Sequence, residues 1–263
     1  MTAHRDHAAE AAAELVTGPR AALEALRAGK RATRRLILAR EERSGIVEEI
    51  LVLARARGVP IVVCPRAELD RQAHGATHQG VLLEVGPFPY VDPEALVAGL
   101  QAGAEPGFLL VLDGIQDPQN LGAIVRSAEA AGVHGCILPR DRAAGVGPAA
   151  VRASAGATEH VPIGRVTNLA AFFEFIRSHG FWVVGTDAAQ GRELFAEDLR
   201  GPVALVIGGE ERGLRPLTKS RCDIVVRIPA RGHVSSLNAS AAAAVCLFEI
   251  ARQRGEREKR GRG

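Results

Sequence analysis

The sequence predicts an α/β protein: a mostly parallel sheet with helices on both faces, joined to a small N-terminal α/β unit. Two observations support this fold class. Apolar runs of strand length alternate with helical patterns along most of the 263 residues, and the runs are continuous rather than interrupted by polar residues. A stretch rich in proline and glycine, residues 87–107, separates two such series and indicates a domain boundary.

The first unit is expected to follow a flexible N-terminus at residues 1–15 and to occupy residues 16–88. Pro19 in a first turn and Gly29 as a terminator favour a helix over 18–30. The further expected elements are strand 34–39, helix 44–58 after the cap candidate Ser44, strand 59–64, short helix 65–72 and strand 79–85.

The second unit is expected at residues 107–253, after a linker with a short helix at 89–106. Its strand candidates are the runs FLLVLD, GCILP, HVPIG, WVVGTD, VALVIGG and DIVVRIP. Helical stretches lie between most of these runs, which is typical of a sheet covered on both faces. A final helix is expected over 236–253, followed by a basic flexible tail at 254–263.

Composition and cysteine usage favour a cytoplasmic globular protein. Hydrophobic residues make up 47% and charged residues 24% of the chain. The four cysteines lie far apart without a CxxC pair, so we expect neither a metal site nor a disulfide framework. There is no apolar signal core and no run of about 18 apolar residues, so we expect no membrane partner.

The net charge of +3 is unevenly distributed. Residues 20–66 hold eleven basic and five acidic residues, and the last twelve residues hold six basic and two acidic ones. Two basic zones suggest a polyanionic partner, although solvated surface charge explains the pattern equally well. With only 4% aromatic residues, base stacking is not expected to dominate binding.

Three loops at strand ends carry unusual chemistry, and ligands of open α/β sheets bind beyond the carboxyl ends of the strands. In the first, LDGIQDPQNLGAIVRSAEAAG, Asn120 is a candidate N-cap for a helix that starts near Leu121. Arg126 is expected to lean back over Gly122 toward the helix start, where an anion is favoured. Asn120 and Arg126 then flank one phosphate or polar reactant; the alternative is an ordinary cap with a surface arginine.

The second loop, ALVIGGEERGLRP, leads a strand into Gly208, Gly209 and Glu210. Its glycines would let a ligand approach the backbone, whereas the spacing of a dinucleotide fingerprint or a P-loop is missing. The alternative is a tight turn with solvated carboxylates.

The third loop, IPARGHVSSLNASAAAA, gathers Ser235, Ser236 and Asn238 at a helix start. The run of small residues after it allows another backbone to approach closely; capping of a tightly packed helix is the alternative. No Ser-His-Asp arrangement and no metal-ligand spacing occurs in the sequence.

Taken in order, the patterns N-L-G-A-I-x-R, I-G-G-E-x-x-G-L and I-P-x-x-x-x-x-S-S-L-N-x-S resemble the three motifs of the SpoU, or TrmH-type, RNA ribose 2′-O-methyltransferases of the SPOUT superfamily. The segments GPRAALEAL and HQGVLLEV look like the ribosomal-protein-like substrate-binding domain of a subgroup that methylates a guanosine in 23S ribosomal RNA. The resemblance covers roughly residues 17–252.

This resemblance implies a trefoil knot in the C-terminal domain, a homodimer and S-adenosylmethionine as methyl donor, without a metal. It implies ribosomal RNA as the partner. A substrate in transfer RNA, an adenosine target of the antibiotic-resistance type, and a non-catalytic RNA-binding protein are the alternatives. A small-molecule enzyme is disfavoured by the missing phosphate-loop spacing.

The resemblance also assigns residues. Asn120, Arg126, Glu210, Ser236 and Asn238 match reactive-site positions. The positions that match cofactor contacts are Gly208, Gly209, Ile228, Leu237 and, more weakly, Gly185. At position 211 the subgroup usually has glycine, so Glu211 puts the shape of the second loop in question.

The expected reaction is attack of a ribose 2′-hydroxyl on the sulfonium methyl group. We hypothesise that Arg126 grips an RNA phosphate and the reacting oxygen, and that a phosphate or water accepts the proton, because a guanidinium stays protonated. Asn120, Ser236 and Asn238 are expected to orient the hydroxyl. Glu210 is expected to hold the loop or the partner subunit's arginine.

Overall fold

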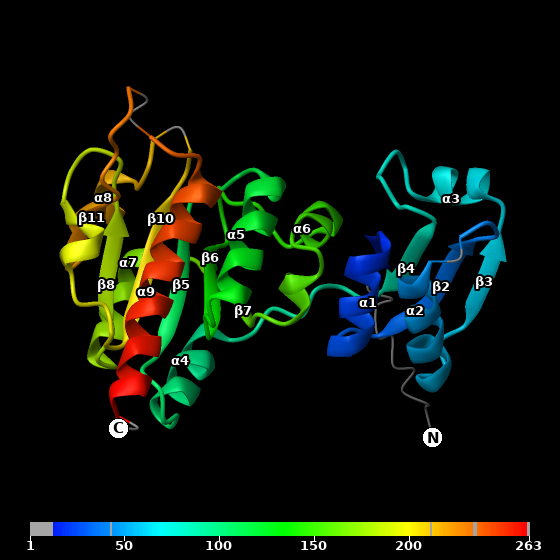
Figure 1. Ribbon diagram of the computed structural model, residues 1–263, viewed down its shortest axis with the longest axis horizontal. Helices are drawn as coiled ribbons and strands as arrows, with labels where there is room; N and C mark the ends of the chain where they lie inside the picture. The colour runs from blue at the N-terminus through cyan, green and yellow to red at the C-terminus, as the bar shows by residue number, and fades with distance from the viewer. Residues whose placement is uncertain (1–12, 43, 211, 234–235, 262–263) are drawn as a thin grey trace, which may run out of the picture. The chain divides into compact units, whose positions relative to one another are not determined.

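The computed structural model describes residues 13–42, 44–210, 212–233 and 236–261. The chain forms two compact units, Met1–Pro89 and Tyr90–Gly263. Each unit has its own sheet (Figure 1), and each is described by itself below.

The N-terminal unit is a four-stranded mixed sheet with the strand order β1-β4-β2-β3. Its elements are β1 (Glu14–Thr17), α1 (Pro19–Ala28), β2 (Thr33–Ala39), α2 (Gly45–Ala56), β3 (Ile61–Cys64), α3 (Arg66–Gln72) and β4 (Val81–Val85). Strands β2 and β3 are parallel, and β4 is antiparallel to both β1 and β2. As predicted, α1 starts at Pro19, and Gly29 ends it in a left-handed conformation.

Strand β1 was missed by the sequence analysis, which assigned residues up to 15 to a flexible N-terminus. The strand is only four residues long, and its pairing with β4 is a tertiary contact without a local sequence signal. Residues 1–12 lie outside the described part of the chain. On one face of this sheet, β2 and β4 pack against α3 through a small apolar cluster that includes Ile37, Leu69 and Leu82.

The C-terminal unit contains a seven-stranded sheet in the order β7-β6-β5-β10-β8-β11-β9. The strands are β5 (Phe108–Asp113), β6 (Gly135–Pro139), β7 (Ile163–Val166), β8 (Trp182–Thr186), β9 (Arg192–Glu193), β10 (Val203–Gly208) and β11 (Ile224–Arg227). Every described pairing between neighbouring strands of this sheet is parallel. The predicted α/β class with a mostly parallel sheet is therefore confirmed.

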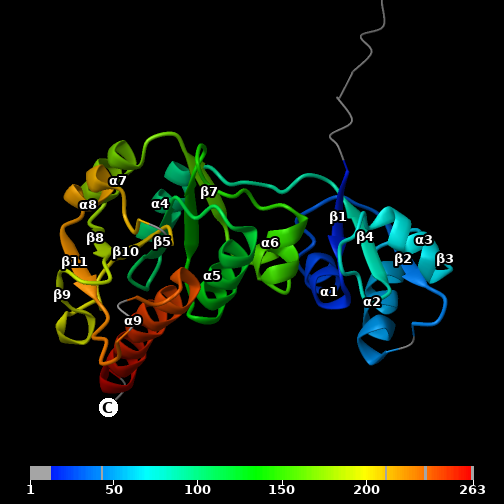
Figure 2. The ribbon, with the colours of Figure 1, turned by 90° about the horizontal axis from the view of Figure 1, so that it is seen from above.

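Helices cover both faces of this sheet (Figure 2). Their bounds are α4 (Pro93–Gln101), α5 (Pro118–Ala130), α6 (Pro148–Ala153), α7 (Leu169–Ser178), α8 (Pro216–Ser220) and α9 (Ala239–Gly261). Helices α4 and α7 pack on one face in a core that includes Val97, Leu109 and Phe173. Helices α5 and α9 lie side by side on the other face.

Two segments differ from the expected linker and tail. Helix α4 buries Val97 in the core of the C-terminal unit, so most of the proline-rich stretch belongs to that unit. Helix α9 continues to Gly261, beyond the predicted end at Gln253. The sequence after Gln253 is rich in Arg, Glu and Lys, which are good helix formers.

No helix in the described ranges is long and apolar enough to span a lipid bilayer.

Candidate functional site

The three sequence loops meet at one edge of the C-terminal sheet. Strands β5 and β10 are parallel neighbours in which Asp113 pairs with Gly208, so the loops that follow both strands leave the sheet together. Helix α9 begins beside them, because it packs on α5 and β10. The first loop, which precedes the other two by roughly ninety residues of chain, therefore forms one site with the second and third loops.

A chain of side-chain hydrogen bonds joins the three loops. The Nδ2 amide of Asn120 donates to carboxylate oxygens of Asp117 and Glu210, the former at 3.0 Å. The Oδ1 atom of Asn120 accepts a hydrogen bond from Nδ2 of Asn238 at 3.1 Å. Asn120 thus connects the second loop with the third, and the orientation of its amide is fixed from both ends.

Asn238 has a second role as the cap of α9. Its Oδ1 accepts hydrogen bonds from the backbone N–H of Ser240 at 2.9 Å and from the Ser240 hydroxyl at 2.6 Å. An amide nitrogen carries two hydrogens, and only one of those on Asn238 is engaged by Asn120. The remaining N–H has no partner among the described residues and can donate to a ligand.

The structure corrects the predicted start of α5. The N-cap is Asp117, whose carboxylate accepts hydrogen bonds from the backbone of Gln119 and Asn120, and Pro118 is the first helical residue. The sequence DPQN contains two good capping residues, and Pro at the first position favours the earlier one. Because Asn120 is already in the helix, its side chain is free to join Glu210 and Asn238.

A cavity of about 450 Å³ lies against this network. It is lined by six of the ten sequence-predicted residues, namely Gly208, Gly209, Glu210, Ile228, Ser236 and Leu237. The loop after β8 adds residues 186–189, which the sequence analysis did not single out. Their position at the end of a neighbouring parallel strand could have identified them from the sequence. The residue predicted in that region was Gly185, which comes just before them.

The glycines of the second loop are required by close backbone packing. A Cβ atom on Gly208 would lie 2.1 Å from the carbonyl carbon of Gly213, and one on Gly209 would lie 2.7 Å from the carbonyl oxygen of Gly114. Gly213 has a φ of 63° and donates its N–H to the carbonyl of Gly209 at 2.9 Å. Glu211, the departure from the subgroup pattern, lies outside the described residues.

Asp113 and Arg215 clamp this loop, and the sequence analysis missed both. The Asp113 side chain is fully buried and accepts hydrogen bonds from the Arg215 backbone N–H at 3.0 Å and Nε at 2.6 Å. The carbonyl of Asp113 also accepts the Gly209 N–H at 3.1 Å. A carboxylate at the end of the buried run FLLVL was the available signal, because a buried charge requires a partner.

Two predicted residues lie outside both the cavity and the hydrogen-bonded network. Gly185 does not line the cavity; it is buried under Cys222, whose Sγ would lie 2.7 Å from an added Cβ. Arg126 is exposed on α5 and, within the described part of the chain, forms no hydrogen bond or ion pair. Gly122 serves helix packing and not the clearance of Arg126, since its missing Cβ makes room for the carbonyl of Ala150 at 2.6 Å.

The thiol at the cavity is not poised for nucleophilic chemistry. Burial raises the pKa of Cys246, which lines the cavity, to about 12, so the thiol stays protonated at neutral pH. Among the described residues no group of three or more His, Cys, Asp or Glu side chains is arranged to hold a metal ion.

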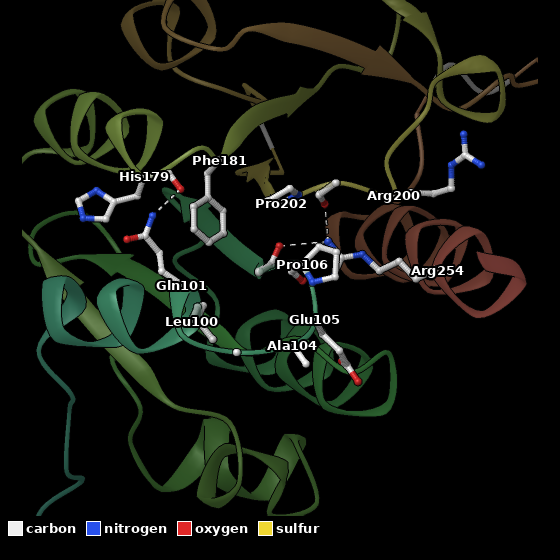
Figure 3. Close-up of a pocket in the computed structure, with 13 residues that line it drawn as sticks. Leu100, Gln101, Ala104, Glu105, Pro106, His179, Phe181, Arg200, Pro202 and Arg254 are labelled. Carbon is white, nitrogen blue, oxygen red and sulfur yellow. Dashed lines mark hydrogen bonds between the residues drawn. The ribbon is translucent and has the colours of Figure 1, made fainter. Parts of the chain in front are cut away.

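A second hollow of about 670 Å³ lies at the opposite, amino-terminal edge of the same sheet (Figure 3). Its floor is the guanidinium of Arg254, which donates to the carbonyls of Pro106, Gly107 and Gly201 at 2.8, 3.0 and 2.7 Å. Burial lowers the pKa of Arg254 to about 10. These contacts engage both terminal nitrogens of the guanidinium with backbone carbonyls, so Arg254 fastens α9 to the segments that lead into β5 and β10.

Fold and site define an α/β protein with a cavity beyond the carboxyl ends of parallel strands, where ligands of such sheets bind, beside a glycine-rich loop. Residues 107–248 match the SpoU rRNA Methylase family, and residues 15–91 match the family described as RNA 2′-O ribose methyltransferase substrate binding. The chain therefore belongs to the SpoU methylase family.

Individual relatives agree over most of the chain. It is 39% identical to the putative TrmH family tRNA/rRNA methyltransferase YacO of Bacillus subtilis, over 92% of this chain and 96% of YacO. It is 44% identical to the 23S rRNA (guanosine-2′-O-)-methyltransferase RlmB of Yersinia pestis, over 80% and 85%. The crystal structure of the SpoU methyltransferase AviRb from Streptomyces viridochromogenes in complex with AdoMet aligns with a TM-score of 0.77 at 30% identity, over 96% and 95%.

Proposed function

We propose that this chain transfers a methyl group from S-adenosylmethionine to the ribose 2′-hydroxyl of a guanosine in 23S ribosomal RNA. The observation that carries the proposal is the joining of Glu210, Asn120 and Asn238 from three separate loops at one cavity. RlmB, a relative that shares most of the chain, is named for this substrate and this reaction.

The cavity fits the proposed methyl donor. Its volume of about 450 Å³ is that of a small-molecule site, and the backbone of the Gly208–Gly209 turn and the apolar side chains of Ile228 and Leu237 form its wall. S-adenosylmethionine supplies an already activated methyl group, bound to a positively charged sulfur. The protein therefore has to position the acceptor hydroxyl and handle its proton.

Asn238 and Ser236 are the groups proposed to touch the ribose hydroxyl. Asn238 and Ser236 are both exposed residues, and Ser236 lines the cavity. Asn120 acts as a positioning residue, because its amide is already bonded to Asp117, Glu210 and Asn238. Glu210 holds the second loop at a fixed place through that amide.

Arg126 is proposed to work across a homodimer built on α5 and α9. It is exposed on α5, and Phe248 on the neighbouring helix α9 is half exposed, so it offers an apolar side chain to such an interface. In such a dimer Arg126 of one protomer reaches the cavity of its partner. There the guanidinium holds an RNA phosphate and stabilises negative charge on the reacting oxygen.

Mixing two inactive variants tests the shared site. If Arg126→Ala and Asn238→Ala each abolish turnover, co-refolded 1:1 mixtures should regain about a quarter of wild-type activity. Half of the dimers are then mixed, and each holds one intact site. Refolding either variant alone is the control. A mixture as inactive as its parents would show that one protomer supplies both residues.

Residues 16–88 select the RNA, residues 89–106 connect, and residues 107–253 transfer the methyl group in the cytoplasm. The C-terminal chain is threaded as a trefoil knot; the contact of Gly208 with Gly213 and Leu214, which leaves no room for a side chain, supports a tightly wound loop there. A knotted chain pulled by its ends would reach a shorter extended length than its residue number allows.

Incubation with methyl-labelled S-adenosylmethionine and unmodified 23S ribosomal RNA tests the activity. We expect label at one guanosine whose 3′-linkage resists alkaline cleavage, because a 2′-O-methyl group removes the internal nucleophile. Transfer RNA belongs in the same assay, since YacO is named for either RNA. Label on transfer RNA alone would reassign the substrate. RNA binding without label on either RNA would favour a non-catalytic binding protein.

A further inference from the structure

The loop between α3 and β4 in the N-terminal unit holds two residues with a strained backbone conformation. His74 has a φ of 48° and Gln79 a φ of 47°, in the left-handed region that side chains with a Cβ rarely adopt. Both residues are exposed. Each such conformation costs on the order of 1 kcal/mol, and residues of this kind cluster where a protein holds a functional group in place.

A buried histidine fixes this loop. The His78 ring is nearly inaccessible, and its Nδ1 accepts the backbone N–H of Gly80 at 3.1 Å. Its Nε2 therefore carries the proton and donates to the carboxylate of Asp70 at 2.8 Å. The carbonyl of Gly80 accepts the Ala39 N–H at 2.8 Å. With its two neighbours anchored, Gln79 is held outward in its strained conformation.

The same sheet edge carries two exposed arginines. Arg40 follows β2 and Arg66 follows β3, and the pairing of Ala39 with Cys64 and of Leu38 with Val81 brings both strand ends next to the loop. Neither arginine forms an ion pair with any described residue. Glu41 follows Arg40 directly, and the Glu42 side chain approaches Gly80.

We propose that Gln79 reads the base of one unpaired nucleotide of the RNA substrate, while Arg40 and Arg66 hold phosphates beside it. This proposal rests on the proposed function and names how its substrate is selected. A glutamine amide offers a donor and an acceptor side by side, which matches a base edge, and unpaired bases present such edges. The exposed ring of His74 provides a surface for stacking.

The acidic neighbours favour a single nucleotide over a long duplex. Glu41 and the partly exposed Glu42 would repel a continuous track of phosphates, whereas one base with flanking phosphates meets the amide and the two arginines. This arrangement selects by sequence and shape, in addition to the general attraction of a basic domain.

The substitution Gln79→Gly tests the proposal, because glycine adopts a positive φ without strain. For the full-length protein and 23S ribosomal RNA transcribed in vitro, we expect the Kd of the RNA to rise about tenfold. The unfolding midpoint should stay constant or rise, and the Kd of S-adenosylmethionine should not change. Gain of stability with loss of RNA affinity is a result that a merely structural Gln79 would not give.

Charge-matched variants complete the test. Arg66→Ala should weaken RNA binding more than Arg55→Ala, since Arg55 is also exposed and without an ion pair among the described residues but lies at the end of α2, near the start of β3. Unchanged RNA affinity of Gln79→Gly, or equal effects of both arginine variants, would overturn the proposal. RNA binding that depends on Gln79 without methyl transfer by the wild type would instead contradict the proposed activity alone.

Discussion

Gly122 sets how closely α5 approaches α6. A Cβ at this position would lie 2.5 Å from the Cβ of Ala153 and 2.6 Å from the carbonyl oxygen of Ala150, and a backbone atom cannot move away as a flexible side chain can. We expect Gly122→Ala to lower the free energy of unfolding by about 1–3 kcal/mol, measured by urea denaturation.

Gly99 provides the matched control. It is also helical, in α4, but an added Cβ would meet nothing within 4 Å. Gly99→Ala should therefore stabilise the protein by about 0.5–1 kcal/mol through helix propensity. Equal effects of the two substitutions on the free energy of unfolding would show that close packing against α6 is not what requires glycine at position 122.

At the scale of single residues, the sequence was informative about chemistry and less so about contacts. It identified Glu210, Asn120 and Asn238 as polar groups at loop ends, but not that one amide bonds the other two residues. The contact between Asn238 and Asn120 spans 118 positions in the chain. No local pattern encodes such a contact, so only the family resemblance joined these residues beforehand.

At the scale of elements, the parallel strands place the site at one edge of the sheet, and the loops that follow them line the cavity. Asp113 ends β5 and holds Arg215 at the start of α8, while its carbonyl holds Gly209 after β10. The clamp keeps the cavity loop at the sheet edge before any ligand arrives. Such preorganisation lowers the entropy lost on binding.

The opposite sheet edge has a comparable link that responds to pH. The N–H of Phe108 at the start of β5 donates to Nδ1 of His134 at 3.0 Å, and this bond requires neutral imidazole. Burial, with the nearby charge of Arg254, lowers the pKa of His134 below its ordinary value of 6.5. The unfolded chain thus binds a proton more readily than the folded one.

The folded protein should consequently lose stability on acidification. The contribution of His134 is fully present above pH 6.5 and is lost as the pH falls toward the lowered pKa. We expect His134→Asn, which keeps an acceptor but cannot titrate, to flatten this part of the pH dependence. Urea denaturation of both proteins between pH 5 and 8 measures it, and parallel curves would exclude His134 as the source.

Helices and strands were predicted well where the sequence carried a strong local pattern and poorly where it did not. Five of the six apolar runs of the C-terminal unit became strands over most of their length, because buried strands leave a continuous apolar pattern. The run HVPIG overlaps β7 only at Ile163 and Gly164, since that strand continues into Arg165 and Val166. Strand β9 was not expected, since its two residues, Arg192 and Glu193, are exposed and pair only with β11. The start of α5 was misplaced because two capping residues compete within four positions.

At the scale of the whole molecule, the residues proposed for RNA recognition and those proposed for methyl transfer belong to different units. The cavity and its polar network belong entirely to the C-terminal unit, and the strained loop with Gln79 belongs to the N-terminal one. The two tasks therefore make separate demands on the sequence. Basic residues outnumber acidic ones at 20–66, whereas small and apolar residues line much of the cavity.

This separation predicts the result of removing the N-terminal unit, and the contacts of Tyr90 and Val91 indicate at which residue the shortened chain should begin. The Tyr90 hydroxyl accepts the Val146 N–H at 2.8 Å, its ring lies 5.2 Å from the Arg165 guanidinium, and Val91 pairs with Gly164. A chain that starts at Tyr90 keeps these contacts. We expect it to bind S-adenosylmethionine with unchanged affinity by calorimetry and to lose most of its affinity for 23S ribosomal RNA. A chain starting at Asp92 serves as the control, with a lower unfolding midpoint. Full RNA affinity in the Tyr90 chain would place substrate recognition in the C-terminal unit instead.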